Sequence, residues 1–516
     1  MISGSFVVDR MSRDLREWID EAEALGALER IDSEVHWNEE MGAIAYCVNK
    51  EIGAPALLFE TITDHEEGFR ALWNLFGSST TRLALSMNED PDLDMKELIS
   101  LGRDRFGTRI DPTFVSDGPV YENSDYGDDV DLHRFPSPRT WPRDGGRYIG
   151  TACAVITENP DTGAINVGTY RGMVQSANAA SINAVQGKDM RAHVEQQWER
   201  DEPLDVAVAY GILPELLLVS GSKYGEAENE FEYAGGVRGS PVELVEGEVT
   251  GLPIPANAEI VAEGRFEPGD LRSEGPFGEF TGYYGEEVAE SPTATFEAVH
   301  YRDDPILTVA AEADYPGGDN GVKSVAMRGA RIWNSLESDL GVPGIEGVYN
   351  PPQAAGGGGM TFVSIDQQYP GHVAQVASVV SGAPVSAYFQ KFVVIVDEDV
   401  EPTDIDQVLW ALATRFHPAE DVQVIEDTWG YPLDPSLPED MRRHGAKLWL
   451  DATKNYKYYD EGEFPERLAL RREMYEHVAE RWDEFDVDVP LPDLPTFYEA
   501  AWDPQSDGGE APYDAS

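Results

Sequence analysis

The chain has 516 residues and a formal net charge of −58, because 96 Asp and Glu residues face only 38 Lys and Arg residues. A polyanion of this size repels nucleic-acid phosphates, whose binding depends largely on neutralisation by Lys and Arg, so we expect no nucleic-acid partner. No stretch approaches the roughly 18 apolar residues needed to span a bilayer, and the first residues lack the basic and apolar regions of a signal peptide. We therefore expect a cytoplasmic protein with no membrane partner.

Carboxylates are spread along the chain, from Glu21 to Asp514, and are not concentrated in one tail. An even coat of carboxylates with few lysines predicts a protein adapted to high salt, where screening weakens the repulsion between like charges. An ordinary acidic cytosolic enzyme is the alternative. Cys47 and Cys153 are the only cysteines, which excludes a disulfide framework and a Cys-rich zinc site and fits a reducing cytoplasm.

The first 115 residues have the pattern of a small α/β unit. Ser12 is a candidate N-cap for a helix that ends at Gly26, because apolar residues recur at helical spacing between them. A strand-like run follows at 56–59, and a polar helix is predicted near 94–101.

From about residue 120 the pattern changes to short β-rich runs separated by turn residues, which is typical of a β-barrel or sandwich with helical insertions. The runs lie at 151–156, 204–208, 216–219 and 259–261, and a helix around 190–200 interrupts them.

Beyond about residue 320, helical and strand patterns alternate, which predicts a second α/β domain. The segments are 373–380, 392–396, 405–414 and 422–425, and the glycine run at 356–359 is predicted to be a turn before a strand. A helix is predicted over 465–485, with Pro465 in its first turn and Leu468, Tyr475, Val478 and Trp482 on one face.

Two segments about 100 residues apart are candidates for chemistry. The segment 166–175 contains Arg171, and the segment 274–284 contains Glu274 and Glu279 on either side of a Gly-Pro-Phe-Gly bend. Of two neighbouring carboxylates, one can be kept for ion pairing and the other kept protonatable, while an arginine can bind a substrate carboxylate bidentately. On composition alone, surface carboxylates of an acidic protein are the simpler interpretation.

The sequence resembles the UbiD family of decarboxylases over nearly its whole length. The resemblance lies in an ordered series of segments that chance similarity does not explain. They are WNLFG at 73–77, DLHRFP at 131–136, DGGRYI at 144–149, NVGTYR at 166–171, AGGVRG at 234–239, EGPFGE at 274–279, LWALATR at 409–415 and LDATK at 450–454.

This resemblance implies an α/β (α+β) chain with four parts, in agreement with the pattern described above. They are an N-terminal α/β unit (1–115), a split β-barrel that binds prenylated FMN (116–320), a C-terminal α/β domain (321–455), and a C-terminal helix with an acidic tail (456–516). In similar proteins the C-terminal parts assemble homodimers or homohexamers.

The resemblance also implies roles for individual residues. Arg171, Glu274 and Glu279 match the catalytic residues that face the substrate above the flavin. We expect Arg171 to pair mainly with Glu274, which leaves Glu279 free to act as general acid. The cofactor is expected to contact Asn166, Gly168, Thr169, Tyr170, Arg171, Lys188, Asp189, Glu230 and Lys391.

A divalent metal ion, Mn²⁺ or Mg²⁺, is implied at Asn166, Asp189 and Glu230, with K⁺ nearby. Asp189 stands where the family has a histidine, and hard divalent ions accept a carboxylate oxygen readily. His193 lies one helical turn further on and is an alternative ligand, as is a site with no third side chain.

The function implied is the non-oxidative, reversible decarboxylation of an aromatic, heteroaromatic or α,β-unsaturated carboxylic acid through a covalent adduct with prenylated FMN. A flavin prenyltransferase supplies that cofactor in similar systems. The alternatives are a non-catalytic flavin-binding or assembly subunit, a flavin oxidoreductase, and a carboxylase in the physiological direction. The joint presence of Arg171, Glu274 and Glu279 disfavours the first, and the lack of a nicotinamide-binding fingerprint disfavours the second.

Overall fold

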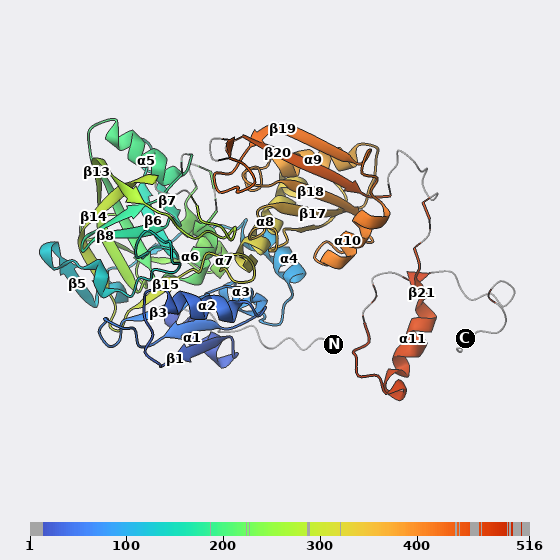
Figure 1. Ribbon diagram of the computed structural model, residues 1–516, viewed down its shortest axis with the longest axis horizontal. Helices are drawn as coiled ribbons and strands as arrows, with labels where there is room; N and C mark the ends of the chain where they lie inside the picture. Colours follow the sequence, from blue (N-terminus) through green and yellow to red (C-terminus); the bar gives the residue numbers. More distant parts are fainter. Residues whose placement is uncertain are drawn as a thin grey trace.

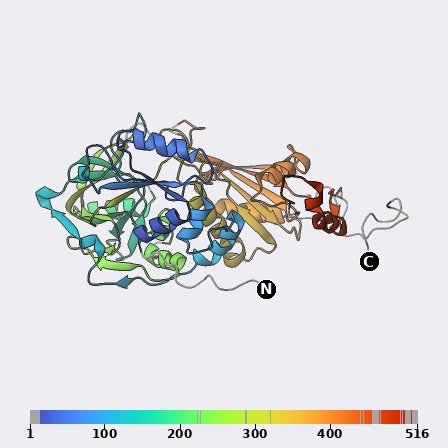
Figure 2. The same cartoon turned by 90° about the horizontal axis from the view of Figure 1, so that it is seen from below.

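The computed structural model describes residues 14–185, 187–222, 224–225, 228–285, 289–319, 321–438, 441–442, 444–454, 464–465, 467–492, 494, 497–498 and 507. An N-terminal unit, a β-rich central unit and a C-terminal α/β unit lie against one another (Figures 1 and 2). One helix near the C-terminus stands apart from them in the view of Figure 1. In the described part of the chain, every helix is too short or too polar to cross a bilayer.

The N-terminal unit is built on a four-stranded sheet in the order β1-β2-β3-β15. Its strands are β1 (Leu28–Ile31), β2 (Ala56–Phe59), β3 (Arg70–Trp73) and β15 (Ile306–Val309), and its helices are α1 (Leu15–Ala24), α2 (Glu40–Asn49), α3 (Thr80–Ser86) and α4 (Met95–Arg105). The predicted strand at 56–59 and the two predicted helices are confirmed. Asp14 caps α1, and Ser12 lies outside the described residues. The unit is not one continuous segment, because β15 returns to it from the region expected for the barrel.

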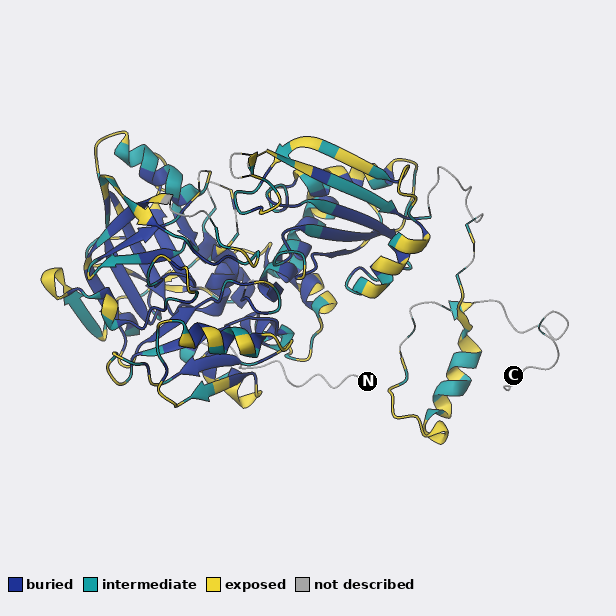
Figure 3. Ribbon diagram, viewed as in Figure 1, coloured by how far each residue is buried: buried dark blue, intermediate teal, exposed yellow. Residues whose placement is uncertain are grey.

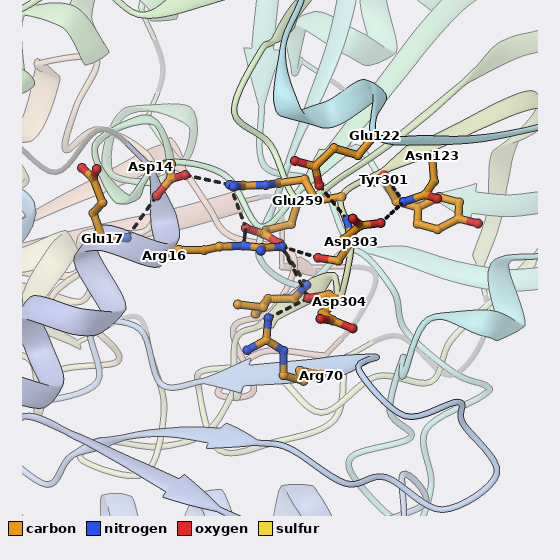
Figure 4. Close-up of polar contacts among 12 residues, drawn as sticks. Asp14, Arg16, Glu17, Arg70, Glu122, Asn123, Glu259, Tyr301, Asp303 and Asp304 are labelled. Atoms are coloured by element: carbon orange, nitrogen blue, oxygen red, sulfur yellow. Dashed lines mark hydrogen bonds and ion pairs between the residues drawn. The ribbon is translucent and has the colours of Figure 1, made fainter.

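A buried ion-pair network joins α1 to the central unit (Figure 4). Arg16 donates two hydrogen bonds of 2.8 Å to the carboxylate of Glu259, whose side chain is 0% exposed. Arg302 donates to the same carboxylate at 3.3 Å and to Asp14 at 2.7 Å. Because the Glu259 carboxylate is removed from water, these two guanidinium groups supply the counter-charge that it would otherwise lack.

Replacing Glu259 by Ala is expected to lower the free energy of unfolding by about 3 kcal/mol, since it leaves Arg302 and Arg16 without their shared counter-charge. The matched control is Glu23→Ala, which removes an ion pair between Arg30 and a side chain that is 44% exposed. That exposed pair is expected to contribute less than about 1 kcal/mol. Urea unfolding at one fixed KCl concentration measures both variants, and equal losses would contradict this account.

The central unit is an eight-stranded sheet in the order β7-β6-β10-β13-β14-β9-β8, with β5 also paired to β14. The strands are β5 (Asn123–Tyr126), β6 (Cys153–Glu158), β7 (Ile165–Gly168), β8 (Gly172–Ser176), β9 (Ala179–Ile182), β10 (Leu204–Tyr210), β13 (Ile260–Glu274) and β14 (Ala289–Tyr301). Strands β7 and β8 form opposite ends of this order, yet only residues 169–171 separate them in the chain. The four Cα-to-Cα steps from Gly168 to Gly172 span at most about 14 Å, so the sheet curves and brings its two edges close together. Arg171 therefore lies where the barrel closes.

Three helices interrupt the barrel strands: α5 (Asp189–Trp198), α6 (Pro214–Ser220) and α7 (Glu230–Arg238). The prediction of a strand at 216–219 is wrong, because these residues belong to α6. All seven residues of α6 are buried. A short run that is apolar on every side carries no periodicity to separate strand from helix, and Pro214 in the first turn favours the helix. The predicted strands at 151–156 and 204–208 and the α5 helix are confirmed within a few residues, and the run at 259–261 marks only the start of β13, which continues to Glu274.

A three-stranded sheet in the order β12-β11-β4 accompanies the barrel. Its strands are β4 (Thr113–Phe114), β11 (Glu243–Glu246) and β12 (Pro253–Pro255). Short 3₁₀ helices lie at Pro119–Tyr121, Gly127–Asp129 and Leu132–Arg134.

The C-terminal unit has a five-stranded sheet in the order β16-β17-β18-β20-β19. The strands are β16 (Ile345–Tyr349), β17 (Met360–Ile365), β18 (Phe392–Asp397), β19 (Val422–Trp429) and β20 (His444–Ala452), and the helices are α8 (Gly321–Asn334), α9 (His372–Gly382) and α10 (Ile405–Thr414), with a π-helical turn at Ser335–Asp339. The predicted alternation of helices and strands is confirmed. Helix α8 packs against α4 and β16, and so connects this unit to the N-terminal one.

The last described elements are β21 (Leu470–Arg471), α11 (Arg472–Glu480), a 3₁₀ turn (Trp482–Phe485) and β22 (Phe497–Tyr498). The prediction of one helix over 465–485 is wrong at its start. Leu470 and Arg471 pair in parallel with Phe497 and Tyr498, and extended backbone cannot continue a helix, so α11 begins only at Arg472. Figure 3 shows that α11 lacks the buried residues that fill the rest of the molecule.

Candidate active site

The three predicted catalytic residues lie together where the edge strands β7 and β8 of the barrel approach each other. Arg171 sits between the edge strands β7 and β8, and Glu274 is the last residue of β13. Glu279 lies in the bend that follows, where its N–H donates to the carbonyl of Tyr283 at 2.9 Å. Closure of the barrel thus joins side chains that are more than 100 residues apart in the sequence.

Arg171 binds both carboxylates through different edges of its guanidinium group. Nε donates to Glu274 Oε1 at 2.8 Å and Nη2 donates to Glu274 Oε2 at 3.0 Å, which is the bidentate geometry. Nη1 donates to Glu279 Oε1. The expected main pairing with Glu274 is confirmed. The expectation that Glu279 is free is wrong, because a guanidinium group engaged on one edge still presents a donor that reaches Glu279.

The surroundings of Glu274 and Glu279 shift the pKa values of the two carboxyl groups in opposite directions. Burial and the charge of Glu274 raise the pKa of Glu279, although the ion pair with Arg171 opposes this. Burial also acts on Glu274, but the bidentate Arg171 outweighs it and lowers the pKa of that carboxyl. Two neighbouring carboxyl groups with opposite pKa shifts can take different roles in catalysis: one remains an anion and the other carries a proton.

Two further residues hold Glu274 in place. The Tyr148 hydroxyl donates to Glu274 Oε1 at 2.9 Å, and Asn183 Nδ2 donates to Oε2 at 2.6 Å. The ring of Phe277 packs against Arg171, with the ring centroid 4.8 Å from the guanidinium carbon. Sequence reasoning did not single out these partners, although Tyr148 belongs to the DGGRYI segment and Phe277 to the EGPFGE segment.

A cavity of about 640 Å³ opens beside Arg171 and Glu279. Aromatic side chains from the central and C-terminal units form one wall: Phe280, Tyr388, Phe389, Trp429 and Tyr431. Tyr431 contacts both Phe389 and Tyr388, with ring centroids 4.3 and 4.7 Å apart. A second cavity of about 290 Å³ shares Arg171, Glu279 and Tyr431 and extends along Thr169, Tyr170 and Lys188.

Three residues of the segment expected to carry the flavin, Thr169, Tyr170 and Arg171, line this second cavity. The Thr169 hydroxyl donates to the carbonyl of Cys153 at 3.0 Å and shares a hydrogen bond of 2.7 Å with Ser220. Gly168 is required beside it, because a Cβ atom there would lie 2.2 Å from the ring of Tyr170. Lys188 lines both cavities. The polar groups of this segment and the cavity beside it fit a flavin nucleotide.

The predicted metal ligands also lie close to one another. Glu230 accepts a hydrogen bond of 2.9 Å from the backbone N–H of Val167, the residue after Asn166. Burial raises the pKa of Glu230 to about 7, and the charge of Asp189 contributes. The amide nitrogen of Asn166 is buried and has no hydrogen-bond partner among the described residues. Oxygen donors around a carboxylate with no described cationic partner fit a hard divalent cation.

The predicted ligand set contains only two carboxylates and an amide. Consistent with that, the described residues contain no group of three His, Cys, Asp or Glu side chains that could hold a metal ion. The alternative ligand His193 is buried in α5, and its Nδ1 shares a hydrogen bond of 2.9 Å with the Thr157 hydroxyl. The third ligand thus remains a prediction.

Lys391, a predicted cofactor contact, forms polar contacts with residues other than the predicted site residues. It lies just before β18, donates to Asp434 at 2.7 Å and to Ser436 at 2.9 Å, and does not line the two cavities described above. Asp434, at the end of the turn that carries Tyr431, provides its counter-charge.

The geometry defines a site for carboxylic acids, in which a buried cation and a protonatable carboxyl group face a cavity with an aromatic wall. Comparison with known proteins agrees with this. Residues 19–101, 113–314 and 325–452 match the N-terminal, Rift-related and C-terminal domains of 3-octaprenyl-4-hydroxybenzoate carboxy-lyase, the UbiD family. The chain belongs to the UbiD family and is a carboxy-lyase, as the sequence predicted.

Individual relatives match over most of their length. The chain is 29% identical to the uncharacterized protein sll0936 of Synechocystis sp., over 94% of this chain and 98% of that one. It is similar to the vanillic acid decarboxylase of Sedimentibacter hydroxybenzoicus in closed form (TM-score 0.83, 26% identity, 93% of this chain and 100% of that one). It is also similar to the UbiD-class enzyme HmfF of Pelotomaculum thermopropionicum in complex with FMN (TM-score 0.76, 28% identity, 88% and 97%). The predicted fold class is confirmed.

Proposed function

We propose that this chain catalyses the non-oxidative, reversible decarboxylation of an aromatic carboxylic acid with prenylated FMN as cofactor. The observation that carries the proposal is the Arg171 guanidinium group, held between Glu274 and Glu279 at a cavity with an aromatic wall. Similarity to a vanillic acid decarboxylase and to HmfF, which is found with FMN and with prenylated FMN, supports the reaction class and the cofactor.

Each residue has a role that follows from its contacts. Glu274 stays ionised and orients Arg171, whose guanidinium group binds the carboxylate that is lost. Glu279 holds the proton that replaces CO₂ on the substrate carbon. Gly168, Thr169, Tyr170 and Lys188 would hold the cofactor. When bound, prenylated FMN would supply an electron sink for the electron pair left as CO₂ departs.

The proposal includes a divalent ion, Mn²⁺ or Mg²⁺, at Asn166, Asp189 and Glu230, with K⁺ nearby. An ion there would offset the charge of a flavin phosphate in a strongly anionic protein. The proposal further includes a flavin prenyltransferase as supplier of the cofactor, a cytoplasmic location, and the division into parts at residues 115, 320 and 455.

We also propose a homo-oligomer, either a dimer or a hexamer, assembled through the C-terminal parts. Helix α11 has no buried residue within the single chain, so its apolar side chains are available to a second copy. HmfF has been obtained in an evolved dimeric form, which supports assembly in this family. Light scattering on the full chain at high salt tests this, and a monomer under all conditions would contradict it.

The function is tested with protein co-expressed with a flavin prenyltransferase and, in parallel, with protein expressed alone. A panel of aromatic acids is assayed at high salt for CO₂ release and for exchange of solvent deuterium into the decarboxylated products. Activity is expected only in the co-expressed protein, where the absorption spectrum shows a modified flavin. If that protein carries the modified flavin but neither releases CO₂ nor exchanges deuterium with any acid, the proposed function is wrong.

A net charge of −58 predicts adaptation to high salt, which is also part of the proposal. The melting temperature is expected to rise as KCl is raised from 0.1 M to 1 M, because the Debye length shortens from about 10 Å to about 3 Å and carboxylate repulsion is screened. Sucrose at equal osmolality is the control for effects that are not ionic. A melting temperature that is constant or falls with KCl would contradict the prediction.

A further inference from the structure

Helix α8 places a second arginine on the cavity that Arg171 and Glu279 line. Ser324 and Arg328 are one turn apart on α8, and both line the cavity of about 640 Å³. The Arg328 guanidinium donates one hydrogen bond, of 3.3 Å, to the carbonyl of Val385. Burial lowers the pKa of Arg328, but an arginine keeps its charge at neutral pH.

Arg328 forms no ion pair with any described residue. Arg82 and Arg147 also lack an ion pair, but each donates several hydrogen bonds, whereas Arg328 donates only the one to Val385 among the described residues. The other arginines that line the cavity are neutralised: Arg171 by Glu274 and Glu279, and Arg191 by Glu195. A half-buried guanidinium without a carboxylate partner is costly unless a ligand supplies the counter-charge.

Arg328, Glu279 and the aromatic wall line the same cavity. Burial raises the pKa of Tyr431; the charge of Glu279 adds to this rise and the charge of Arg328 opposes it, so Tyr431 lies near both groups. Tyr431 packs edge-on against Tyr388, and Tyr388 lies 4.8 Å from the Trp429 ring. A planar ring that rests on these side chains would lie in a cavity that both Arg171 and Arg328 line.

The backbone that carries this wall is held in a strained conformation. Phe389 has a φ of 77°, which is rare for a non-glycine residue. The buried Lys447 ammonium donates to the carbonyls of Ala387 and Gln390 on either side of it, at 2.8 and 3.1 Å. Gly358 makes room for the ring, since a Cβ atom there would lie 2.4 Å from it. Strain maintained in this way at a cavity points to a ligand-binding function.

We propose that Arg328 is a specificity-determining residue that binds a second acidic oxygen group on the aromatic substrate, either a second carboxylate or a ring hydroxyl. The substrate is therefore an aromatic acid that carries such a group on the ring, away from the carboxylate that is lost. This inference rests on the proposed function and narrows its substrate class.

The test measures binding of three acids to the holoenzyme by calorimetry: benzene-1,4-dicarboxylate, 4-hydroxybenzoate and 4-methylbenzoate, together with the corresponding 1,3-isomers. The wild type is expected to bind at least one of the first two about 10- to 100-fold more tightly than the methyl compound, since a charge-assisted hydrogen bond is lost in the latter. Which of the two is preferred distinguishes a carboxylate from a hydroxyl group. In Arg328→Gln the preference is expected to vanish, and in Arg328→Lys it is expected to be partly restored.

The matched control is Arg200→Gln, which removes the same charge from an ion pair with Asp161 at the surface, and should keep the preference. The inference is overturned if the wild type binds 4-methylbenzoate as tightly as the others or binds none of them, or if Arg328→Gln keeps the preference. Loss of flavin from Arg328→Gln would also overturn it, because Arg328 would then bind the cofactor. Binding with the expected preference but without CO₂ release would contradict the proposed function alone.

Discussion

Replacing Glu279 by Gln is expected to lower turnover by about 100-fold or more while the fold, flavin and metal contents stay unchanged. The amide has nearly the same shape as the carboxyl group but cannot deliver a proton to the substrate carbon once CO₂ has left. An exposed glutamate has a pKa near 4.3 and would already be ionised at neutral pH. Burial and the charge of Glu274 raise the pKa of Glu279, which favours the protonated form that the step needs.

The same variant is expected to stop deuterium incorporation into the decarboxylated product, and to change the pH profile. In the wild type, turnover falls on the alkaline side as Glu279 loses its proton, and the raised pKa moves this limb above the range of an exposed glutamate. Glu279→Gln has no such proton to lose, so its low residual rate is expected to lack the limb. Single-turnover measurements across pH separate the proton step from product release.

Glu274→Asp is the matched comparison, because it keeps the negative charge next to Arg171 and only shortens the side chain by one methylene group. Its effect is expected to be milder than that of Glu279→Gln. The pKa of Glu274 is lowered, so this group is ionised across the range in which Glu279 titrates and adds no alkaline limb. If Glu279→Gln decarboxylates and exchanges deuterium at close to the wild-type rate, another group supplies the proton and the assigned role is wrong.

Replacing Glu230 by Ala is expected to remove the divalent metal and, with it, most of the cofactor. Outer partners of a metal site typically contribute a factor of about 10 to 100 in affinity, and a direct ligand should contribute more. Without the ion, a flavin phosphate would face Asp189 in a protein of net charge −58, with only Lys188 among the cationic groups proposed to hold the cofactor. Elemental analysis and the flavin absorption of the purified protein measure both losses.

Glu232→Ala is the matched control. It lies on the same helix, α7, but its carboxylate accepts a hydrogen bond of 2.6 Å from Arg109 at the surface, away from Asn166 and Asp189. This variant is expected to keep metal and flavin at wild-type levels. Should Glu230→Ala retain stoichiometric manganese and prenylated flavin, the proposed metal site would be refuted; loss of both from Glu232→Ala would show a general effect of charge.

Much of the fold could be predicted because its signals are local. The capping box at Asp94 and Glu97 marks the start of α4, and α10 occupies the predicted residues 405–414. The predictions were wrong where the sequence carries no local signal for the element. Every side of α6 is buried, so its apolar run has no period, and α11 is shortened by strand pairing with residues far along the chain.

The sequence by itself determined the family and the fold class and singled out Arg171, Glu274 and Glu279 as the predicted catalytic residues, because these depend on residue types in ordered segments. Tertiary structure alone decided what surrounds them. Closure of the barrel places Tyr148 and Asn183 on Glu274 and lets Arg171 reach Glu279 as well. Packing of the C-terminal unit brings Arg328 and Tyr431 to the same cavity. Such contacts join residues with no common sequence pattern, and burial, which sets the acidity of Glu279, exists only once the chain is folded.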